Sequence, residues 1–384
     1  MSVGTELRTS FALMVFLQSA VPALPCTLCG GNIYSRPTLR QEGERSRIVL
    51  AGKLGEARED VNLPGGGTTV FHIDHIVKGA DLLAQQSKVV LPRFLPSDDK
   101  GRNTTWLLFG EIRNGRFDYQ SARPISDKTT IDYLRSTLAT SQKPRSEFLQ
   151  SLPKYLENPV PEIAADAFQE LTAATDAEIG RLSRETSPSL LRRLLSSNKT
   201  PVERIGLIAF LLAGCGEAKD AETLRELLER DWERVRESYS GLLAGYIVLQ
   251  PVSGWKRAEE VVRSKKHPFL QRYAVLGTVR FLHEAQQQID RKNFLIVFDA
   301  SLDDDDIADM VIEDLRRWQW WDLERRIIAK MPQKDSDGPM LRRAIVRFAL
   351  SCPNKDSQRF IAQQRRTDPE FVSQMEASLR DEGK

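Results

Sequence analysis

The chain has 384 residues, of which 41% are hydrophobic and 28% are charged. This balance is typical of a folded globular protein and excludes a wholly disordered chain and a polytopic membrane protein. The 55 Lys and Arg residues nearly cancel the 53 Asp and Glu residues, so the sequence lacks the basic excess of a nucleic-acid-binding protein. Four Cys and four His residues are too few for a disulfide scaffold or a metal-rich protein. At roughly 150 residues per domain, the length predicts two or three domains.

Residues 1–23 are typical of a secretory signal peptide. Arg8 supplies a positive charge ahead of the apolar run 11–17, which is shorter than the roughly 20 residues that a membrane-spanning helix needs. Ala23 is a small residue of the kind found at cleavage sites, so we expect cleavage after it. A lipid anchor at Cys26 and an uncleaved anchor helix are the alternatives. The sequence therefore predicts an exported protein, periplasmic or extracellular, whose mature chain does not span a membrane.

Cys26 and Cys29 form a Cys-x-x-Cys pair near the start of the predicted mature chain. At this spacing two thiols can form a local disulfide, carry out thiol exchange, or supply half of a zinc site. The sequence has no second cysteine pair to complete such a site, so we predict no metal and no cofactor. An oxidising compartment favours a structural disulfide between Cys26 and Cys29. Thiol-redox chemistry at the pair stays open.

Within residues 24–140 the pattern predicts a small five-stranded β-barrel of the OB type. The short segments are rich in Val, Ile, Thr and Phe and are separated by turn residues. The predicted strands are Arg47–Leu54, Thr68–Val77, Lys88–Leu95, Thr104–Ile112 and Arg116–Ser121. A barrel closes its own edges, and a helix over residues 127–140, with Ser126 as its N-cap, would follow it.

Five aromatic residues alternate with the period of the predicted strands. They are Phe94, Trp106, Phe109, Phe117 and Tyr119. Barrels of the OB type also bind sugars and oligonucleotides through stacked aromatic rings. Because the alternation places side chains on the inner face of a strand, we expect these aromatics to fill the core.

Three segments of this domain, Ile48–Lys53, Phe71–Gly79 and Thr105–Phe109, carry a family resemblance. Together with the cysteine-bearing N-terminus they resemble the netrin-like, OB-type barrel of tissue inhibitors of metalloproteinases. The resemblance implies this fold and, as an alternative function, inhibition of a metalloprotease through binding of its catalytic zinc by the N-terminal cysteine. The chain departs from the family because Leu24 and Pro25 precede the first cysteine, and because the partner cysteines of the barrel are missing.

Two polar clusters suggest a metal site, but neither has the required spacing. On a strand, His72 and Asp74 share one face while His75 lies on the other, so we expect all three to be solvated. The run Asp303–Asp306 lacks the spacers and the glycine of a calcium loop. Acidic residues stabilise the N-terminus of a helix, and we therefore expect this run to cap the helix that follows.

Four prolines within residues 141–161 predict a linker around one short helix, and residues 162–384 predict an α-solenoid of helix pairs. The richest apolar segments recur about every 33 to 40 residues and centre on Ala167, Leu207, Leu243, Leu276, Val311 and Ile345. More amphipathic segments lie between them, at Ala221–Arg234, Gly254–Arg263, Lys292–Phe298 and Ser357–Gln364. This period indicates a solenoid and resembles HEAT-type repeats; an irregular helical bundle is the alternative.

Three tryptophans, Trp318, Trp320 and Trp321, lie close together in the predicted solenoid. The three-residue spacing of Trp318 and Trp321 favours burial of both between helices. Trp320 would then point elsewhere and be exposed. A contact of these side chains with a ligand or a partner is the alternative interpretation.

The sequence contains no nucleophile elbow, no metalloprotease His-Glu-x-x-His segment and no P-loop. We therefore assign no catalytic residue and expect no enzyme. Solenoids present long concave surfaces to protein partners. The sequence predicts an exported, non-enzymatic protein-binding or scaffold protein of the cell envelope. The alternatives are a metalloprotease inhibitor acting through Cys26 and a thiol-redox protein using Cys26 and Cys29.

Overall fold

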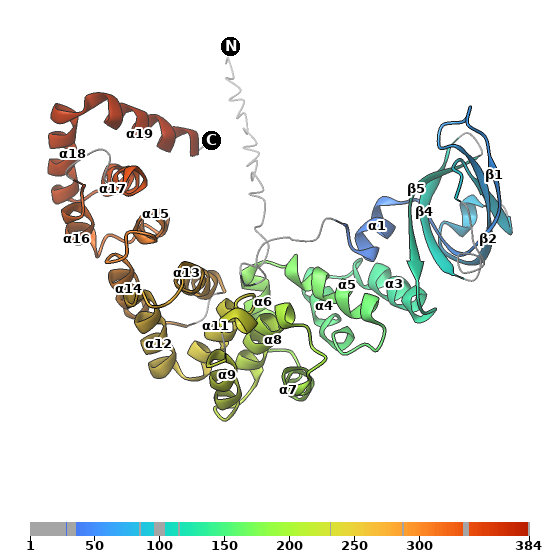
Figure 1. Ribbon diagram of the computed structural model, residues 1–384, viewed down its shortest axis with the longest axis horizontal. Helices are drawn as coiled ribbons and strands as arrows, with labels where there is room; N and C mark the ends of the chain where they lie inside the picture. Colours follow the sequence, from blue (N-terminus) through green and yellow to red (C-terminus); the bar gives the residue numbers. More distant parts are fainter. Residues whose placement is uncertain are drawn as a thin grey trace, which may run out of the picture.

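The computed structural model describes residue 28 and residues 36–83, 86–95, 104–113, 116–230, 232–285, 288–332 and 338–382. The predicted signal peptide and the pair Cys26 and Cys29 lie outside these residues. An antiparallel sheet forms one end of an arc-shaped molecule, and helices form the rest (Figure 1). The predicted mixed β and α architecture is confirmed.

The sheet contains five strands in the order β3-β2-β1-β4-β5. They are β1 (Ile48–Glu59), β2 (Gly67–Lys78), β3 (Lys88–Leu91), β4 (Thr105–Arg113) and β5 (Arg116–Ile125). A short helix η2 (Ala80–Leu82) follows β2. The prediction of a closed barrel was wrong, because β3 and β5 are the edges of the sheet in the described part of the chain. β3 ends after four residues, immediately before Pro92, which has no N–H with which to extend a strand ladder.

Both faces of the sheet are buried, and β1 contributes to each of them. Ile48 and Leu50 point into the curved interior, where Phe117 also packs. Val49 and Phe109 point to the other face, which is covered by α1 (Leu39–Arg45), α3 (Thr129–Thr140) and α5 (Pro161–Thr172). The remaining aromatics of the predicted set are half-buried, so their main role is packing.

The start of α3 differs from the prediction. Lys128 occupies the N-cap position without a side-chain cap, while the Asp127 carboxylate accepts a hydrogen bond from the backbone N–H of Thr129 at 2.7 Å. Ser126 instead donates its hydroxyl to Glu162 of α5, at 2.8 Å. Ser126 therefore does not cap α3, because its hydroxyl is bound by Glu162, which lies 36 positions away in sequence.

The predicted linker is packed against the helical core. It forms α4 (Arg145–Gln150) and η3 (Pro153–Tyr155). Phe148 and Leu152 belong to the core of the helical region. α5, which follows, has Ala167 in the core beneath the sheet and Phe168 in the helical core. The sheet and the helices are thus joined by shared buried side chains.

The helical region has two layers that curve together (Figure 1). The inner layer contains α8 (Val202–Cys215), α11 (Tyr239–Leu249), α13 (Phe269–Glu284), α15 (Ala308–Arg317) and α17 (Pro339–Ser351). The outer layer contains α9 (Asp220–Leu228), α12 (Pro251–Arg263), α14 (Arg291–Ser301), α16 (Glu324–Ala329) and α18 (Lys355–Thr367). α6 (Asp176–Ser183), α7 (Pro188–Ser196) and α10 (Trp232–Val235) complete the first part of the stack, and α19 (Pro369–Glu382) closes its far end. The predicted alternation of apolar and amphipathic helices corresponds to these two layers.

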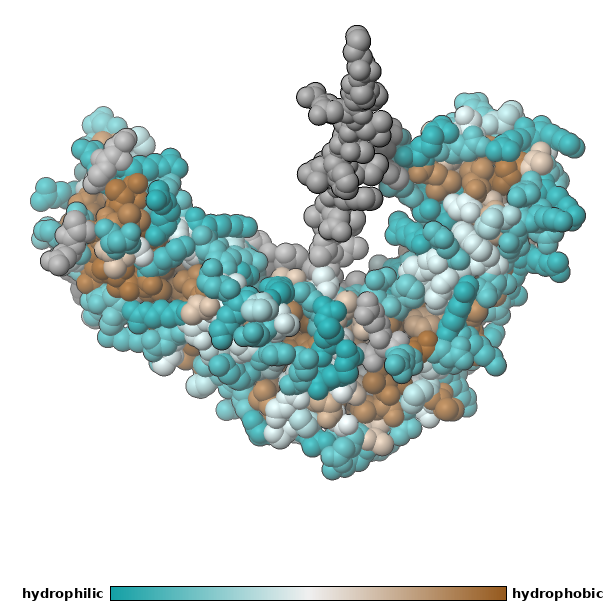
Figure 2. Space-filling model, turned by 180° about the vertical axis from the view of Figure 1, so that it is seen from behind, coloured by the Kyte–Doolittle hydropathy of each residue, from teal (hydrophilic) through white to brown (hydrophobic). Residues whose placement is uncertain are grey.

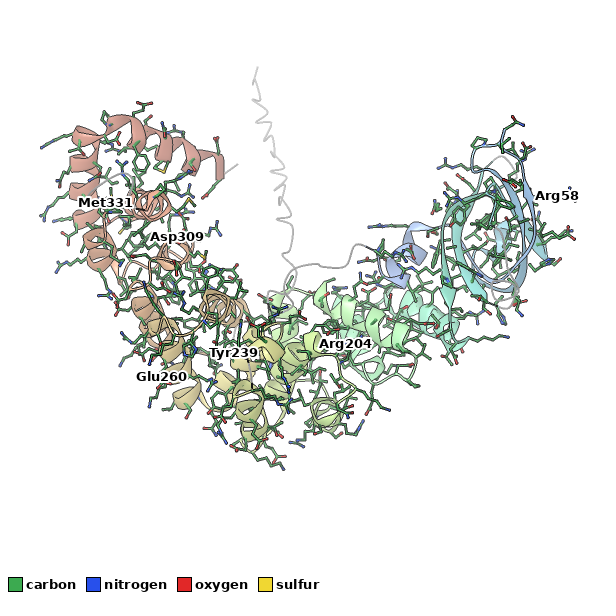
Figure 3. All side chains as sticks on the ribbon, viewed as in Figure 1. Arg58, Arg204, Tyr239, Glu260, Asp309 and Met331 are labelled. Carbon is green, nitrogen blue, oxygen red and sulfur yellow. The ribbon has the colours of Figure 1, made fainter. Side chains whose placement is uncertain are left out.

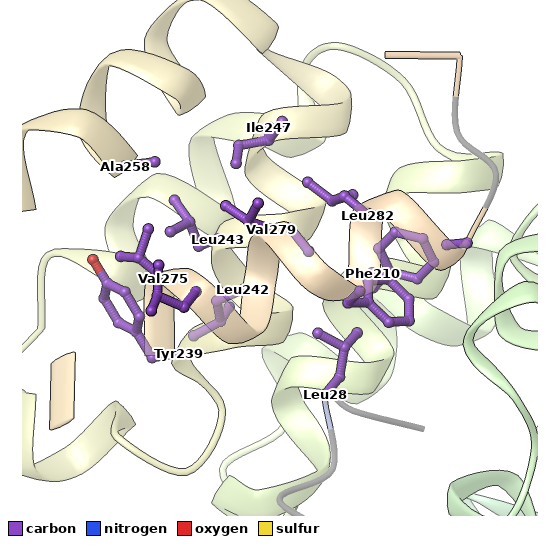
Figure 4. Close-up of a cluster of buried hydrophobic side chains, with 14 of the residues drawn as sticks. Leu28, Phe210, Tyr239, Leu242, Leu243, Ile247, Ala258, Val275, Val279 and Leu282 are labelled. Carbon is purple, nitrogen blue, oxygen red and sulfur yellow. The ribbon is translucent and has the colours of Figure 1, made fainter. Parts of the chain in front are cut away.

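The helical core includes one residue from the N-terminal segment. Leu28 is buried among side chains of α8, α11 and α13, close to Phe210 and Leu242 (Figure 4). α8 and α11 pack closely because Gly206 and Gly241 face each other, and a Cβ built on Gly241 would lie 2.4 Å from the Gly206 backbone. A Cβ on Gly206 would lie 2.8 Å from the Ser238 carbonyl oxygen, so this approach of the two helices needs glycine at both positions.

Candidate functional site

The candidate binding site lies along α15 and α17, on the concave side of the arc. Asp309 of α15 is on this side, whereas Glu260 of α12 is on the outer layer (Figure 3). The face seen from behind is mostly hydrophilic, with separate hydrophobic patches (Figure 2).

Three hollows follow one another along α15, and together we call them the α15–α17 groove. The first, of about 800 Å³, is lined by Asp305, Asp306, Asp309, Met310, Lys330, Pro332, Gly338, Pro339, Met340 and Leu341. The second, of about 470 Å³, shares Asp309, Met310 and Met340 and adds Arg280, Glu313, Asp314, Arg317, Arg343, Ala344, Arg347, Ser378 and Glu382. The third, of about 730 Å³, shares Arg317 and Glu382 and adds Arg316, Gln319, Trp321, Ser351, Pro353 and Leu379.

Most of the charges in the second hollow are already paired. Arg347 donates to Glu313 at 2.7 Å and also forms an ion pair with Glu382, the last described residue of α19. Arg280 donates to Asp314 at 2.7 Å. Burial raises the pKa of the Asp314 carboxyl, and the positive charge of Arg280 opposes that shift. These contacts tie α13, α15, α17 and α19 together.

Three other charged side chains of the groove are not part of these ion pairs. Arg317 and Arg343 are exposed and Asp309 is half-buried. None of the three forms an ion pair with another described residue. Asp309, Met310 and Met340 are shared by the first and second hollows, while Arg317 is shared by the second and third. The second hollow therefore has a carboxylate without an ion pair at one end and a guanidinium without an ion pair at the other, and the charge of Arg317 also lowers the pKa of the neighbouring Asp314 carboxyl.

Two of the three tryptophans lie in an aromatic cluster. The Trp318 ring stacks on His283 with centroids 3.8 Å apart, and Trp320 meets the same His283 ring edge-on at 5.4 Å. Arg291 covers the Trp320 ring at 4.5 Å. Trp320 is half-buried rather than exposed, because its ring packs against the helical core. Gln319 adopts the left-handed conformation (φ 56°), and the backbone N–H of Trp320 donates to the Leu315 carbonyl at 2.9 Å.

Trp321 alone of the three reaches the groove. It packs edge-on against Phe348 with ring centroids 5.1 Å apart, and it also lines the third hollow. The structure thus separates the three tryptophans into two environments. Sequence reasoning missed Asp309, Arg317 and Arg343, the charged side chains of the second hollow that form no ion pair with a described residue. An isolated charged residue on a helix has no local signature that distinguishes a binding residue from a solvated one.

The cysteines of the described residues offer no redox site. Cys215 and Cys352 are free thiols, and burial raises the pKa of both, which disfavours the reactive thiolate. The predicted disulfide or redox pair, Cys26 and Cys29, lies outside the described residues.

The cluster of His72, Asp74 and His75 does not form a metal site. His72, Asp74 and His75 are exposed on β2. Nowhere in the described ranges do three or more His, Cys, Asp or Glu side chains converge as metal ligands.

The prediction that the run Asp303–Asp306 caps a helix was wrong. Ile307 is the N-cap of α15, without a side-chain cap. The four carboxylates instead form ion pairs with basic residues of neighbouring elements: Asp303 with Arg326, Asp304 and Asp306 with Arg272, and Asp305 with Lys330.

Comparisons with known proteins add little to this description. No protein-family model matches the chain, and no curated protein matches it. A solved structure of human deoxyhypusine hydroxylase in complex with glycerol is similar, with 12% sequence identity and a TM-score of 0.26, over 66% of this chain and 91% of that chain. A likeness at this level supports neither a shared fold nor a shared activity. The netrin-like and HEAT-type resemblances stay predictions.

Among the described residues, no helix is both long enough and apolar enough to cross a bilayer.

Proposed function

We propose that this chain is an exported, non-enzymatic scaffold that binds a partner protein through the α15–α17 groove. The observation that supports the proposal is the series of three hollows along α15, in which Met310 and Met340 line the wall together with charged side chains of both signs that form no ion pair with a described residue. Apolar contacts supply binding energy and unpaired charges fix orientation in protein interfaces.

The dimensions of the groove suit a segment of polypeptide. α15 has 10 residues and is therefore about 15 Å long. An extended chain rises about 3.3 Å per residue, so about five residues of a partner would follow the length of this helix. Small-molecule sites are single enclosed cavities with an apolar lining, whereas these hollows run in series and are lined by many charges.

The binding proposal is tested by site-specific photo-crosslinking. The photoreactive residue p-benzoylphenylalanine is placed at Met340, whose side chain in the groove is 61% exposed, or at Val252 of the outer layer, which is 87% exposed. We expect a crosslinked protein species from position 340 and none from position 252. Equal crosslinking from both positions, or none from position 340, would contradict a partner in the groove.

Export is a separate part of the proposal and rests on the sequence of residues 1–23. Cell fractionation followed by N-terminal sequencing of the purified protein tests it. We expect the protein in the envelope or medium fraction, with a mature N-terminus at Leu24. A cytosolic protein that retains Met1–Ala23 would contradict export and leave the groove proposal standing.

A further inference from the structure

We propose that the partner segment is acidic, and that it places an apolar side chain on Met310 and Met340 and a carboxylate between Arg343 and Arg317. This inference rests on the proposed binding function and names the chemistry of the occupant. Its basis is that Arg317 and Arg343 lie on the neighbouring inner helices α15 and α17 and line the same hollow of about 470 Å³.

The two guanidinium groups are available because their neighbours are already neutralised. Arg347 is paired with Glu313 and Glu382, and Arg280 is paired with Asp314. Arg317 and Arg343 are exposed and form no ion pair with a described residue, and Arg317 acts on the Asp314 carboxyl only through its charge. Arginine binds carboxylates in a bidentate, charge-assisted manner, so an Asp or Glu side chain is the group that these two positions recognise best.

Glu382 shows that a carboxylate is accommodated in this place. Its side chain, from the last turn of α19, accepts from Arg316 at 2.7 Å and also pairs with Arg347. It lines the second hollow as well as the third, as Arg317 does. Arg316 and Arg347 thus already bind one carboxylate, that of Glu382, while Arg317 and Arg343 line the same hollow without an ion pair to a described residue.

The apolar half of the subsite lies one helical turn away. Met340 is 61% exposed and precedes Arg343 by three residues, so the two side chains share one face of α17. Methionine side chains adapt to differently shaped apolar groups. Asp309 lies beside this apolar end and repels further acidic residues there. The segment should therefore be acidic on the Arg317 side only.

A nucleic acid is the other polyanion that arginines could bind, and the surroundings disfavour it. Glu313, Glu382 and Asp309 line the same hollow and would repel a continuous row of phosphates. The net charge of +2 over the whole chain adds no attraction of the kind that nucleic acids require.

The test measures fluorescence anisotropy of a labelled peptide with leucines in the middle and glutamates at one end, titrated with the full chain. Two control peptides replace the glutamates by lysines or the leucines by serines. We expect only the first peptide to bind well, and its affinity to fall with added salt. Failure of the wild-type chain to bind it, or equal binding of the lysine peptide, would overturn the proposal. An unlabelled single-stranded oligonucleotide that displaces the peptide would do the same, in favour of a nucleic-acid site.

Charge-reversal variants locate the subsite. Arg317→Glu and Arg343→Glu should each weaken peptide binding by about tenfold or more, because each change removes a charge-assisted contact and adds a carboxylate that repels the acidic peptide. Arg366→Glu is the matched control, because Arg366 is an exposed residue of the outer helix α18. Arg317→Lys and Arg343→Lys, which keep the charge but cannot form the bidentate contact, should weaken binding less than the corresponding Glu variants do. Equal affinity of all these variants would overturn the assignment, and circular dichroism confirms that each is folded.

The same variants separate this inference from the proposed function. If crosslinking from position 340 captures a protein whose yield is unchanged by the Arg317→Glu and Arg343→Glu double change, the scaffold proposal stands and the acidic segment is wrong. If position 340 captures nothing, the scaffold proposal itself fails.

Discussion

The buried carboxylate of Asp166 on α5 accepts a hydrogen bond from the hydroxyl of Tyr133 on α3 at 2.9 Å. Its other oxygen accepts from the backbone N–H of Leu39, the first residue of α1, at 2.8 Å. One side chain of the helical region thus holds two helices that cover the sheet. This relationship fixes how the sheet is attached to the start of the helical stack.

The Asp166 contact should make stability depend on pH. Burial raises the pKa of Asp166 to about 6 from its ordinary value of 3.8, against the opposing effect of its hydrogen bonds to Leu39 and Tyr133. A raised pKa means that the folded state binds the proton more tightly than the unfolded state. The stability from this group is therefore fully present below about pH 3.8 and is lost as the pH rises through about 6.

Asp166→Asn removes this titration. From pH 5 to pH 7.5, the wild type should lose about 1 to 2 kcal/mol more of its free energy of unfolding than the variant does, because only the wild type ionises at this position. Chemical denaturation of both proteins at the two pH values measures the difference. Parallel pH profiles would show that Asp166 is ionised in the folded protein at both pH values.

Glu170, one turn further along α5, should contribute more to the free energy of unfolding than Glu44, a more exposed partner of the same arginine, Arg40. Its fully buried carboxylate accepts two hydrogen bonds from Arg40, at 2.9 and 2.8 Å, and one from Thr38. Glu170→Ala would leave Arg40 buried without this partner, at a cost of about 3 kcal/mol. Glu44→Ala is the matched control, because Glu44 pairs with the same Arg40 at the surface and should cost less than about 1 kcal/mol. Urea denaturation that ranks the two variants equally would contradict this.

The strands were predictable from the sequence because their signal is local. The alternation of apolar residues and the turn residues between them gave all five strands, and β1 begins within one residue of the predicted start. Closure of a barrel depends on whether β3 and β5 meet, which no local pattern specifies. The capping role assigned to Ser126 failed for the same reason, since Glu162 reaches it from another helix.

The candidate site was the least predictable part. Met310 and Met340 both line the groove only because α15 and α17 stack in neighbouring repeats. The period of the helices predicts that they are neighbours, but it does not say which charges remain unpaired after stacking. That Arg347 finds Glu313 and Glu382 while Arg343 finds no described ion-pair partner depends on side-chain geometry.

The contact between α8 and α11 should tolerate no added methyl group. A Cβ at Gly241 would lie 2.4 Å from backbone atoms of Gly206, whereas a Cβ at Gly277 of α13 would lie no closer than 3.2 Å to the Ser240 side chain. We expect Gly241→Ala to destabilise the protein by about 1 to 3 kcal/mol and Gly277→Ala to be close to neutral, because its better helix propensity offsets the tight contact. Thermal unfolding compares them, and a neutral Gly241→Ala would show that the two helices are further apart.

Two neighbouring residues of the run Asp303–Asp306 should differ strongly in their effect on stability, because one is buried and the other is exposed. Asp304 is 3% exposed and pairs with Arg272, which is 5% exposed. Its neighbour Asp305 has an exposed side chain that reaches Lys330 at 3.5 Å. Asp304→Ala would remove the buried partner of a buried guanidinium and should cost about 3 kcal/mol, whereas Asp305→Ala should change stability by less than about 0.5 kcal/mol. If the run were instead a calcium site, both variants would lose a stabilisation that added calcium gives to the wild type. Differential scanning calorimetry with and without calcium separates the two cases, and we expect a large loss at Asp304, almost none at Asp305, and no calcium-dependent shift of the melting temperature in any of the three proteins.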